Sequence, residues 1–520
     1  MKPRQAPADT IWFCIRRNAV ARRAGWIHGD SLSDLRRVVG ARPDETVEVC
    51  IASNFRHIPT RRFARTFYPR ARGLIGIEIA LGGDLLRLAP TRMVAANLGF
   101  ERALMRFLEE REVSREDFAA HGCLRSFCAE QYLLFSGNQC QLTKLFRGGA
   151  LIETGPTFER QFAVELADGI EGWMLSNLSI DGSLPYKYWP SRGSQSPADN
   201  AIRRFLATIA LARLGELRDS AEIRDAARRN LRFNLRRYFQ PIGNGRGAIV
   251  EHTGAKLGAA ALAGLAIMEN PSRDEFTAEL AMLAAGVNSL VDDEHGFRTF
   301  FFPGDRDGEN WNFYSGEALL FWAEASRRGI PHAPTLERCT TVFELCRKRH
   351  YRKRNPAFVP WQTQACASLF AQTGLRQFAD FALELNDWLQ TMQQRDGVDP
   401  DLSGRFYDPL HPEFGPPHAA STGVYLEGFA DAMALACALG EARRASSYER
   451  TINLGLRSLR QLQFRGLHDM FYISKPERVQ GALRTEVYDN AVRLDSAAHA
   501  LLAAIKLLVP MNFGRQLSVE

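Results

Sequence analysis

The chain has 520 residues, of which 45% are hydrophobic and 24% charged, the composition of a folded soluble protein long enough for two domains or one large ring of repeats. Its net charge of +7 is modest for this length, and no lysine-rich patch or zinc-finger spacing favours nucleic-acid binding. Most of the basic residues are arginines, which favours an anionic ligand over a neutral one, with genome composition as the alternative reason for the enrichment.

The nine cysteines are an odd number scattered among apolar neighbours, as at Cys14, Cys50, Cys366 and Cys437, which indicates buried thiols in a reducing compartment. No HExxH motif or paired CxxC spacing occurs, so we expect neither a metal nor another cofactor. The apolar run near the N-terminus is too short for a signal peptide, and no apolar run is long enough to span a bilayer. We therefore expect a cytoplasmic protein that does not bind membranes.

Residues 1–150 predict a small α/β or α+β domain. Three runs rich in Ile and Val, bounded by polar or glycine residues, predict strands at 10–17, 45–53 and 71–81. A helical period of apolar residues predicts helix within 91–110. The sequence does not fix the role of this domain, which could contact a pathway partner or a second copy of the chain.

From residue 157 to about 510, helical patterns replace the strand signals, and we interpret 202–214, 257–268 and 378–392 as amphipathic helices. Aromatic loops rich in Gly and Pro recur at intervals of about 50–70 residues, with two helices between neighbouring loops. These loops lie at roughly 181–198, 240–253, 292–313, 350–360, 395–419 and 465–487. One helix before the first loop and one after the last bring the expected total to twelve.

Twelve helices in six hairpins are the count for a closed (α/α)6 toroid, in which helix 158–178 pairs with helix 488–508. An open α-solenoid is the alternative. The segments DNAIRR at 199–204 and DNAVRL at 489–494 each precede a long apolar stretch, and Asp or Asn there would cap a helix. We interpret them as equivalent helix starts five repeats apart. The expected fold is thus mainly α, with domains at 1–150 and 157–510.

The first loop and the helix after it combine aromatic and basic side chains. Aromatic faces stack on sugar rings, while arginines hydrogen-bond sugar hydroxyls and any uronate carboxylate. Packing within the loop is the alternative role for the tyrosines, and a solvated flank is the alternative for Arg204. The candidates for binding or catalysis here are Tyr186, Lys187, Tyr188, Arg192, Asn200, Arg203 and Arg204.

The third loop enters its helix through Glu309, Tyr314 and Glu317. A carboxylate beside a groove is a candidate acid or base if burial raises its pKa. Glu317 is the stronger candidate because an apolar run follows it directly. Its alternative role is to oppose the positive end of the helix dipole.

The helices after the fifth and sixth loops supply the remaining candidates. Asp495 and His499 are four residues apart on one helix face, a spacing that lets the carboxylate orient the imidazole, although a structural buried histidine is the alternative. The full set on these two helices is Tyr425, Glu427, Arg493, Asp495 and His499.

The segments DGSLPYKYWPSRG, DNAIRR, KLGAAALAGLAIME, SGEALLF and STGVYLEGFADAMALA resemble the C-terminal toroid of the D-glucuronyl C5-epimerase-like group in the six-hairpin glycosidase-like superfamily. The resemblance covers roughly 160–508. It implies a groove for a uronate-containing glycan, in which Tyr and Glu side chains exchange the C5 proton and a cation holds the carboxylate. Tyr186 or Tyr188, Tyr425, Glu317 and Arg204 would fill these roles. Unlike this chain, epimerases of the group carry β-rich accessory domains and work in secretory compartments.

We therefore expect a carbohydrate-active enzyme that binds an anionic carbohydrate or another acidic small molecule and acts as an epimerase, a lyase or a hydrolase. Tyr186, Tyr188, Arg204 and Glu317 should then share one positively charged pocket. The alternative is a non-catalytic toroid that serves a biosynthetic pathway as a scaffold or a ligand-binding component. That alternative predicts exposed and scattered carboxylates.

Overall fold

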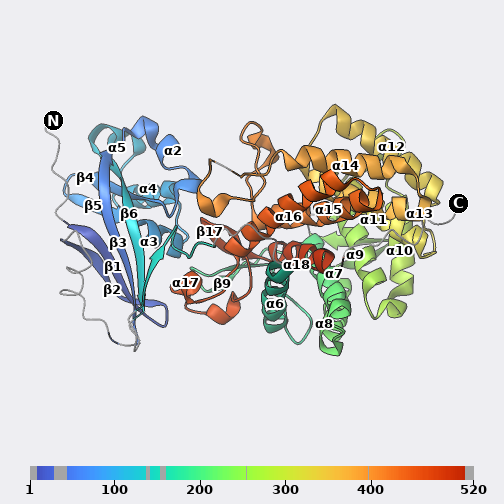
Figure 1. Cartoon of the computed structure of the whole chain (residues 1–520), viewed down its shortest axis with the longest axis horizontal. Coiled ribbons are helices and arrows are strands. Elements are labelled where there is room, and N and C mark those ends of the chain that lie inside the picture. The colour runs from blue at the N-terminus through green and yellow to red at the C-terminus, as the bar shows by residue number, and fades with distance from the viewer. Residues whose placement is uncertain are drawn as a thin grey trace.

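The computed structural model describes residues 9–28, 42, 44–135, 141–152, 160–252, 254–395 and 397–509. An N-terminal domain built on one β-sheet lies beside a large ring of helices (Figure 1). This arrangement confirms the predicted fold class, a mainly α toroid after a small domain of mixed structure, here of the α+β type.

The sheet of the N-terminal domain is antiparallel, with strands in the order β2-β1-β3-β6-β4-β5 and β7 paired to β6. The strands predicted at 10–17, 45–53 and 71–81 correspond to β1, β3 and β4. The four others carry a weaker Ile and Val signal. The strands are β1 (Asp9–Arg17), β2 (Val20–His28), β3 (Thr46–His57), β4 (Ile75–Leu81), β5 (Asp84–Leu88), β6 (Cys123–Phe135) and β7 (Gln141–Leu145).

Short helices cover one face of this sheet. Phe100 and Leu104 of α4 share a buried cluster with Ile77 and Ile79 of β4. The predicted helical stretch 91–110 is divided in two, because Asn97 adopts a left-handed backbone conformation with φ 48°. The helices are α2 (Phe63–Thr66), α3 (Pro90–Ala95), α4 (Phe100–Glu109) and α5 (Arg115–His121).

The rest of the described chain contains twelve long helices, as the loop spacing predicts. They are α6 (Arg160–Asn177), α7 (Ala201–Leu217), α8 (Ala221–Tyr238), α9 (Leu257–Glu269), α10 (Thr277–Asn288), α11 (Trp311–Arg327), α12 (Leu336–Arg352), α13 (Val359–Thr373), α14 (Arg376–Gln390), α15 (Ala419–Ala438), α16 (Ala442–Leu462) and α18 (Leu494–Leu508). One short helix, α17 (Leu467–Met470), lies in the last loop.

The twelve helices form two concentric layers and the ring is closed. The inner helices pack in the order α7, α9, α11, α13, α15 and α18, and α18 returns to pack on α7. Each inner helix also packs on one outer helix, and α6 covers α18. The predicted pairing of the first helix with the last is therefore confirmed, and the open solenoid is excluded.

The inner helices are buried on nearly every side, since each has two inner neighbours and an outer one. In α9, every residue from Leu257 to Met268 is buried, so the expected amphipathic pattern over 257–268 is wrong. Small residues permit this packing: a Cβ on Gly264 would lie 2.3 Å from the Phe321 ring of α11. The outer helices α8, α14 and α16 are amphipathic, because one face of each meets solvent.

The two DNA[IV]R segments are not equivalent helix starts. The Asn200 side chain caps α7 by accepting a hydrogen bond from the Arg203 backbone N–H at 3.2 Å. In the second copy, Asp489–Arg493 form strand β17, and α18 begins at Leu494 without a side-chain cap. Asn490 instead donates a hydrogen bond to the Val94 carbonyl of the N-terminal domain at 2.6 Å.

All six loops lie at one rim, because each connects an outer helix to the amino end of an inner helix. Two small sheets order these loops, one formed by β10, β11, β12 and β15 and another by β16, β17, β8 and β9. Their strands are β8 (Lys187–Trp189), β9 (Ser194–Gln195), β10 (Phe239–Gly243), β11 (Arg246–Glu251), β12 (Gly254–Lys256), β15 (Phe300–Phe302), β16 (Arg484–Glu486) and β17 (Asp489–Arg493). A two-stranded ladder joins β13 (Val291–Asp292) and β14 (Gly296–Phe297).

The N-terminal domain docks on the fifth and sixth loops. The buried Arg147 guanidinium contacts Asp401 at 2.6 Å and Asp399 at 2.9 Å, both in the fifth loop. Arg72 donates a hydrogen bond to the Tyr488 carbonyl at 2.7 Å in the sixth loop. The domain thus abuts the rim that carries all six loops. The boundaries at 1–150 and 157–510 stay a prediction, since 153–159 lie outside the described residues.

Eight of the cysteines lie in the described part of the chain, and all of these are free thiols. Cys14, Cys50 and Cys366 are buried as predicted, whereas Cys437 is exposed at the end of α15. Among the described helices, none combines the length and the apolar character that a membrane span requires. The described residues contain no cluster of His, Cys, Asp and Glu arranged to hold a metal ion.

Candidate active site

A cavity of about 400 Å³ opens at the loop rim, in the centre of the ring. All six inner helices and the fifth loop contribute to its wall. Aromatic residues form much of that wall, which suits stacking against the C–H faces of a sugar. The aromatic lining residues are Phe313, Tyr314, Trp361, Phe406, Tyr407, Phe414 and Tyr425.

Glu317 lines the cavity from α11 and is only 3% exposed. Its Oε2 atom has no hydrogen-bond partner, and no ion pair to Glu317 occurs among the described residues. Burial raises the pKa of this carboxyl to about 8. Gly258 of α9 makes room for it, because a Cβ at that position would lie 2.0 Å from the Glu317 Oε2.

His499 lines the same cavity from the opposite side of the ring, since α18 is three places from α11 in the closed order of inner helices. Glu317 is the seventh residue of α11 and His499 the sixth of α18, which places both roughly 7–9 Å below the helix starts. The two side chains therefore meet a ligand at similar depth from opposite walls.

The His499 imidazole is oriented by Glu427. The Nδ1 atom of His499 lies 2.7 Å from Oε1 of Glu427, which is buried in α15. Because a carboxylate accepts hydrogen bonds, Nδ1 carries the proton and Nε2 is left as the basic nitrogen. The expectation that Asp495 orients His499 is wrong, since Asp495 turns to two arginines instead.

Asp495 bridges those arginines at the mouth of the cavity. Its carboxylate lies 2.8 Å from the Arg203 Nε atom and 2.5 Å from a terminal nitrogen of Arg493. Both cations hold the pKa of Asp495 far below its usual range although the group is buried. Two positive charges face one negative charge, so this wall carries a net positive charge. Arg203 also donates a hydrogen bond to the Tyr186 hydroxyl, which places Tyr186 behind the cavity wall.

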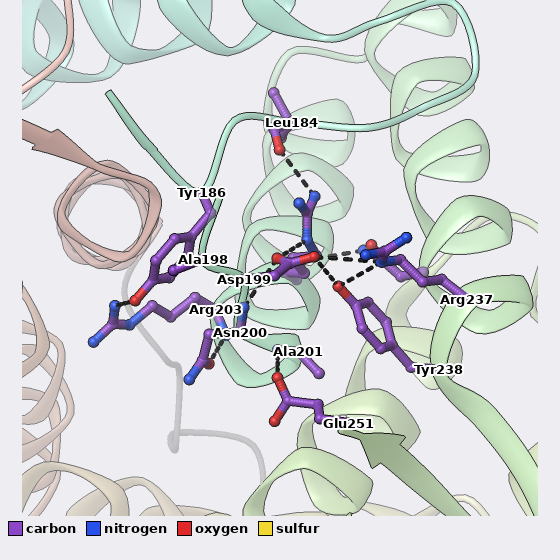
Figure 2. A network of polar contacts seen from close by, with 12 residues as sticks. Leu184, Tyr186, Ala198, Asp199, Asn200, Ala201, Arg203, Arg237, Tyr238 and Glu251 are labelled. Atoms are coloured by element: carbon purple, nitrogen blue, oxygen red, sulfur yellow. Dashed lines mark hydrogen bonds and ion pairs between the residues drawn. The ribbon is translucent and has the colours of Figure 1, made fainter. Parts of the chain in front are cut away.

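Arg204 does not line the cavity and instead pairs with Asp199, whose contacts Figure 2 shows. Its guanidinium contacts Asp199 at 2.5 Å and donates a hydrogen bond to the Leu184 carbonyl at 2.9 Å. The same carboxylate accepts a hydrogen bond from Tyr238, which helps burial to raise the pKa of Tyr238 to about 12. Adjacent residues of a helix point about 100° apart, so only one of Arg203 and Arg204 can face the ring axis. The prediction that Arg204 lies in the pocket with Glu317 is wrong.

Other predicted residues also lie outside the cavity. Tyr188 is 3% exposed and belongs to the core, with Arg478 over its ring. Lys187 lies over the Trp189 ring, and Arg192 lines a different recess. Glu309 is exposed and paired with Arg306 at 2.6 Å. The predicted residues that line the cavity are Asn200, Arg203, Tyr314, Glu317, Tyr425, Arg493, Asp495 and His499.

Sequence reasoning missed His418, Lys256 and Asp408, which also line the cavity. His418 caps α15, its Nδ1 accepting a hydrogen bond from the Ser421 backbone N–H at 3.0 Å. Burial, with Arg493 nearby, lowers the pKa of His418 to about 4, so the ring is neutral and offers Nε2–H as a donor. The pattern HAAS just before a long apolar run was its sequence signal, but histidine is an uncommon capping residue.

No protein-family model matches the sequence, and no curated protein resembles it in sequence. Among solved structures, an inactive α-1,6-mannanase variant of Salegentibacter in complex with α-1,6-mannotriose matches 67% of this chain and 99% of its own, with 11% identity and a TM-score of 0.47. Cellobiose 2-epimerase of Bacillus thermoamylovorans matches 67% of this chain and 98% of its own, with 9% identity and a TM-score of 0.49.

An unsaturated glucuronyl hydrolase specific for heparin matches 67% of this chain and 97% of its own, with 11% identity and a TM-score of 0.47. The closed ring of the present protein follows from its own helix contacts. The resemblance to the D-glucuronyl C5-epimerase-like group stays a prediction.

Proposed function

We propose that the protein is a carbohydrate-active enzyme in which Glu317 and His499 transfer protons to and from a sugar held in the ring cavity. The observation that carries this proposal is a buried carboxyl with a pKa of about 8, free of ion pairs to the described residues, opposite an imidazole oriented by Glu427. At pH 7 such a carboxyl is mostly protonated, so it can donate a proton, while the histidine Nε2 can accept one.

Epimerisation beside a uronate carboxylate uses both groups. His499 removes the proton from C5, the negative charge spreads into the sugar carboxylate, and Glu317 donates a proton to the opposite face of that carbon. One C–H bond breaks and one forms, and exchange with solvent restores both side chains. Arg203 and Arg493, which outnumber Asp495 by one charge, support an anionic sugar at this wall.

The buried and convergent carboxylates favour an enzyme over a non-catalytic scaffold. Glu317, Glu427 and Asp495 are each at most 6% exposed; Glu317 and Asp495 line the cavity, and Glu427 reaches it through its contact with His499. Burying carboxylates costs free energy unless a partner or a function compensates, and among the described residues none forms an ion pair with Glu317 or a hydrogen bond with its Oε2.

Deuterium uptake tests the proposal directly. Candidate uronate-containing glycans incubated with the enzyme in D2O should gain deuterium at C5, as read by NMR, and Glu317→Gln should reduce the rate by at least about a hundredfold because Gln carries no exchangeable acid proton. Glu309→Gln is the matched control, since Glu309 is exposed on the same helix entrance. Uptake undiminished in Glu317→Gln, or lost equally in both variants, would refute the assignment.

A hydrolase is the second candidate because of Asp408. This carboxylate lines the same cavity from the fifth loop, and no ion pair to it occurs among the described residues. Glu317 as the acid and Asp408 as the base would complete the pair of carboxyl groups that glycoside hydrolysis needs. New reducing ends without deuterium at C5, lost in Asp408→Asn, would favour the hydrolase.

A further inference from the structure

A second recess, of about 590 Å³, lies between the N-terminal domain and the loop rim. Strand β1, helices α3 and α4, the turn after β8 and the last loop all contribute to it. We propose that this recess binds a phosphate or diphosphate group, either as a free anion or as part of a nucleotide. The proposal is independent of the sugar chemistry of the ring cavity.

Five arginines line the recess, and no described Asp or Glu does. They come from parts of the chain far apart in sequence: Arg16, Arg92, Arg102, Arg106 and Arg192. Arg16 is compensated by the buried Glu48 at 2.8 Å, and Arg102 only weakly by Glu109 at 3.5 Å. Neither Arg92 nor Arg106 has an ion pair within the part of the chain that the structure describes.

The arginines that remain uncompensated repel one another across the recess in the empty protein. A bound anion with two or more negative charges would remove that repulsion and accept bidentate hydrogen bonds from several guanidinium groups. Compact, multiply charged oxyanions of this kind are phosphates and diphosphates. A single carboxylate would leave most of the positive charge unopposed.

Two further features of the recess supply hydrogen-bond donors. Helix α4 begins at its edge: Gly99 is the N-cap residue, and no side chain caps the first turn, so backbone N–H groups remain there for an anion. Tyr472 lines the recess and is only 7% exposed, and its hydroxyl lies near Asn490 without a hydrogen bond of normal geometry. An oxyanion in the recess would satisfy the backbone N–H groups directly, and the buried Tyr472 hydroxyl would have to turn toward it.

Isothermal titration of the full chain with inorganic pyrophosphate tests the proposal, with uridine diphosphate titrated in parallel. We expect saturable binding of pyrophosphate that weakens roughly tenfold or more in Arg102→Gln/Arg106→Gln, and also in Arg192→Gln from the opposite wall. Similar affinities for the two probes would indicate a site for the free anion, whereas tighter binding of uridine diphosphate would indicate a nucleotide.

The matched control is Arg61→Gln/Arg62→Gln, which removes two exposed arginines of the same domain away from the recess. It should bind pyrophosphate like the wild type. No binding to the wild type, or equal losses in the control and the recess variants, would overturn the proposal. Circular dichroism would verify that each variant is folded, and every substituted arginine is exposed, so unfolding is not expected.

Discussion

The burial of Glu317 determines both the protonation state of its carboxyl and the free energy that the ionised form costs the folded protein. A buried carboxyl holds its proton when no cation offsets the loss of water, and no ion pair to Glu317 occurs in the part of the chain that the structure describes, so its ionised form is expensive. Gly258 shows that the neighbouring helix accommodates the group, since no other side chain fits at that position without moving Glu317. A residue that served only to pack would be replaced by an apolar one at lower cost.

The free energy needed to ionise the buried Glu317 carboxyl should make the stability of the protein depend on pH. The folded-state pKa of about 8 lies above the ordinary glutamate value of 4.5, so the folded protein binds the extra proton between these pH values and its free energy of unfolding falls as pH rises through them. Glu317→Gln removes this titration. Between pH 5 and pH 8.5, we expect the free energy of unfolding of the variant to rise by several kcal/mol relative to that of the wild type. Urea unfolding at both pH values measures this difference.

The same comparison with Glu309→Gln should show no such gain, because Glu309 is exposed. A stability difference between Glu317→Gln and the wild type that is constant with pH would mean that Glu317 ionises in the folded protein as it does in the unfolded chain. That result would also remove the basis for its role as an acid.

The sequence predicts residue types at the site better than their partners. Glu317 is identifiable as a candidate because an apolar run follows it directly, which favours burial of the carboxyl with that run. Arg203 and Arg204 were not separable, since the phase of α7 relative to the ring axis decides which of them faces the cavity. The partner of His499 is Glu427 on another helix, and spacing within one helix cannot reveal a contact made by the ring closure.

At the scale of the elements, the loop interval predicts the twelve helices because each hairpin repeats the same length. The short strands of the loops were missed, since β8 to β17 span 2–6 residues and leave no period to recognise. The equivalence of the two DNA[IV]R segments fails for a related reason: a five-residue pattern suits a cap and a short strand equally, and the docking of Asn490 on Val94 decides between them.

Two glycines inside helices, Gly264 and Gly172, differ in how closely other atoms surround them. Substituting alanine at each position therefore compares a packed site with an open one. A Cβ on Gly264 of α9 would lie 2.3 Å from the Phe321 ring, whereas a Cβ on Gly172 of α6 would meet nothing within 4 Å. Gly264→Ala should lower the free energy of unfolding by about 1–3 kcal/mol through overpacking of α9 against α11. Gly172→Ala should raise it by about 0.5–1 kcal/mol, because alanine favours the helix.

Chemical denaturation of the two variants measures both effects under the same conditions. Stabilisation by Gly264→Ala would show that α9 and α11 are not in close contact. It would therefore contradict the tight inner layer on which the depth of the ring cavity depends.

At the scale of the whole molecule, the N-terminal domain affects the ring cavity through its position more than through its own fold. It contacts the fifth and sixth loops, and these loops precede the inner helices that carry Glu427 and His499. Neither the side of the ring that the domain covers nor the ion pairs that hold it follow from the sequence, because residues 147 and 401 are more than 250 positions apart. The domain thus supports the wall of the cavity from outside.

Arg147 makes ion pairs between the N-terminal domain and the fifth loop. Replacing it therefore tests whether these ion pairs hold the domain on the ring. The guanidinium is buried and holds the buried Asp401 at 2.6 Å and the partly exposed Asp399 at 2.9 Å. Arg147→Ala leaves Asp401 buried without its cation, a change that costs about 3–5 kcal/mol. We expect the N-terminal domain to loosen from the ring, so that calorimetry shows a separate, earlier transition and limited proteolysis cleaves between the two parts.

Replacing both partners, as in Arg147→Met/Asp401→Leu, removes the charge along with its partner and should recover most of the loss. The double variant distinguishes loss of the ion pair from loss of packing around residue 147. If docking of the domain supports the fifth loop, Arg147→Ala should also weaken ligand binding in the ring cavity while Arg147→Met/Asp401→Leu restores it. A single variant with unchanged stability and an undivided transition would show that the domain is held elsewhere.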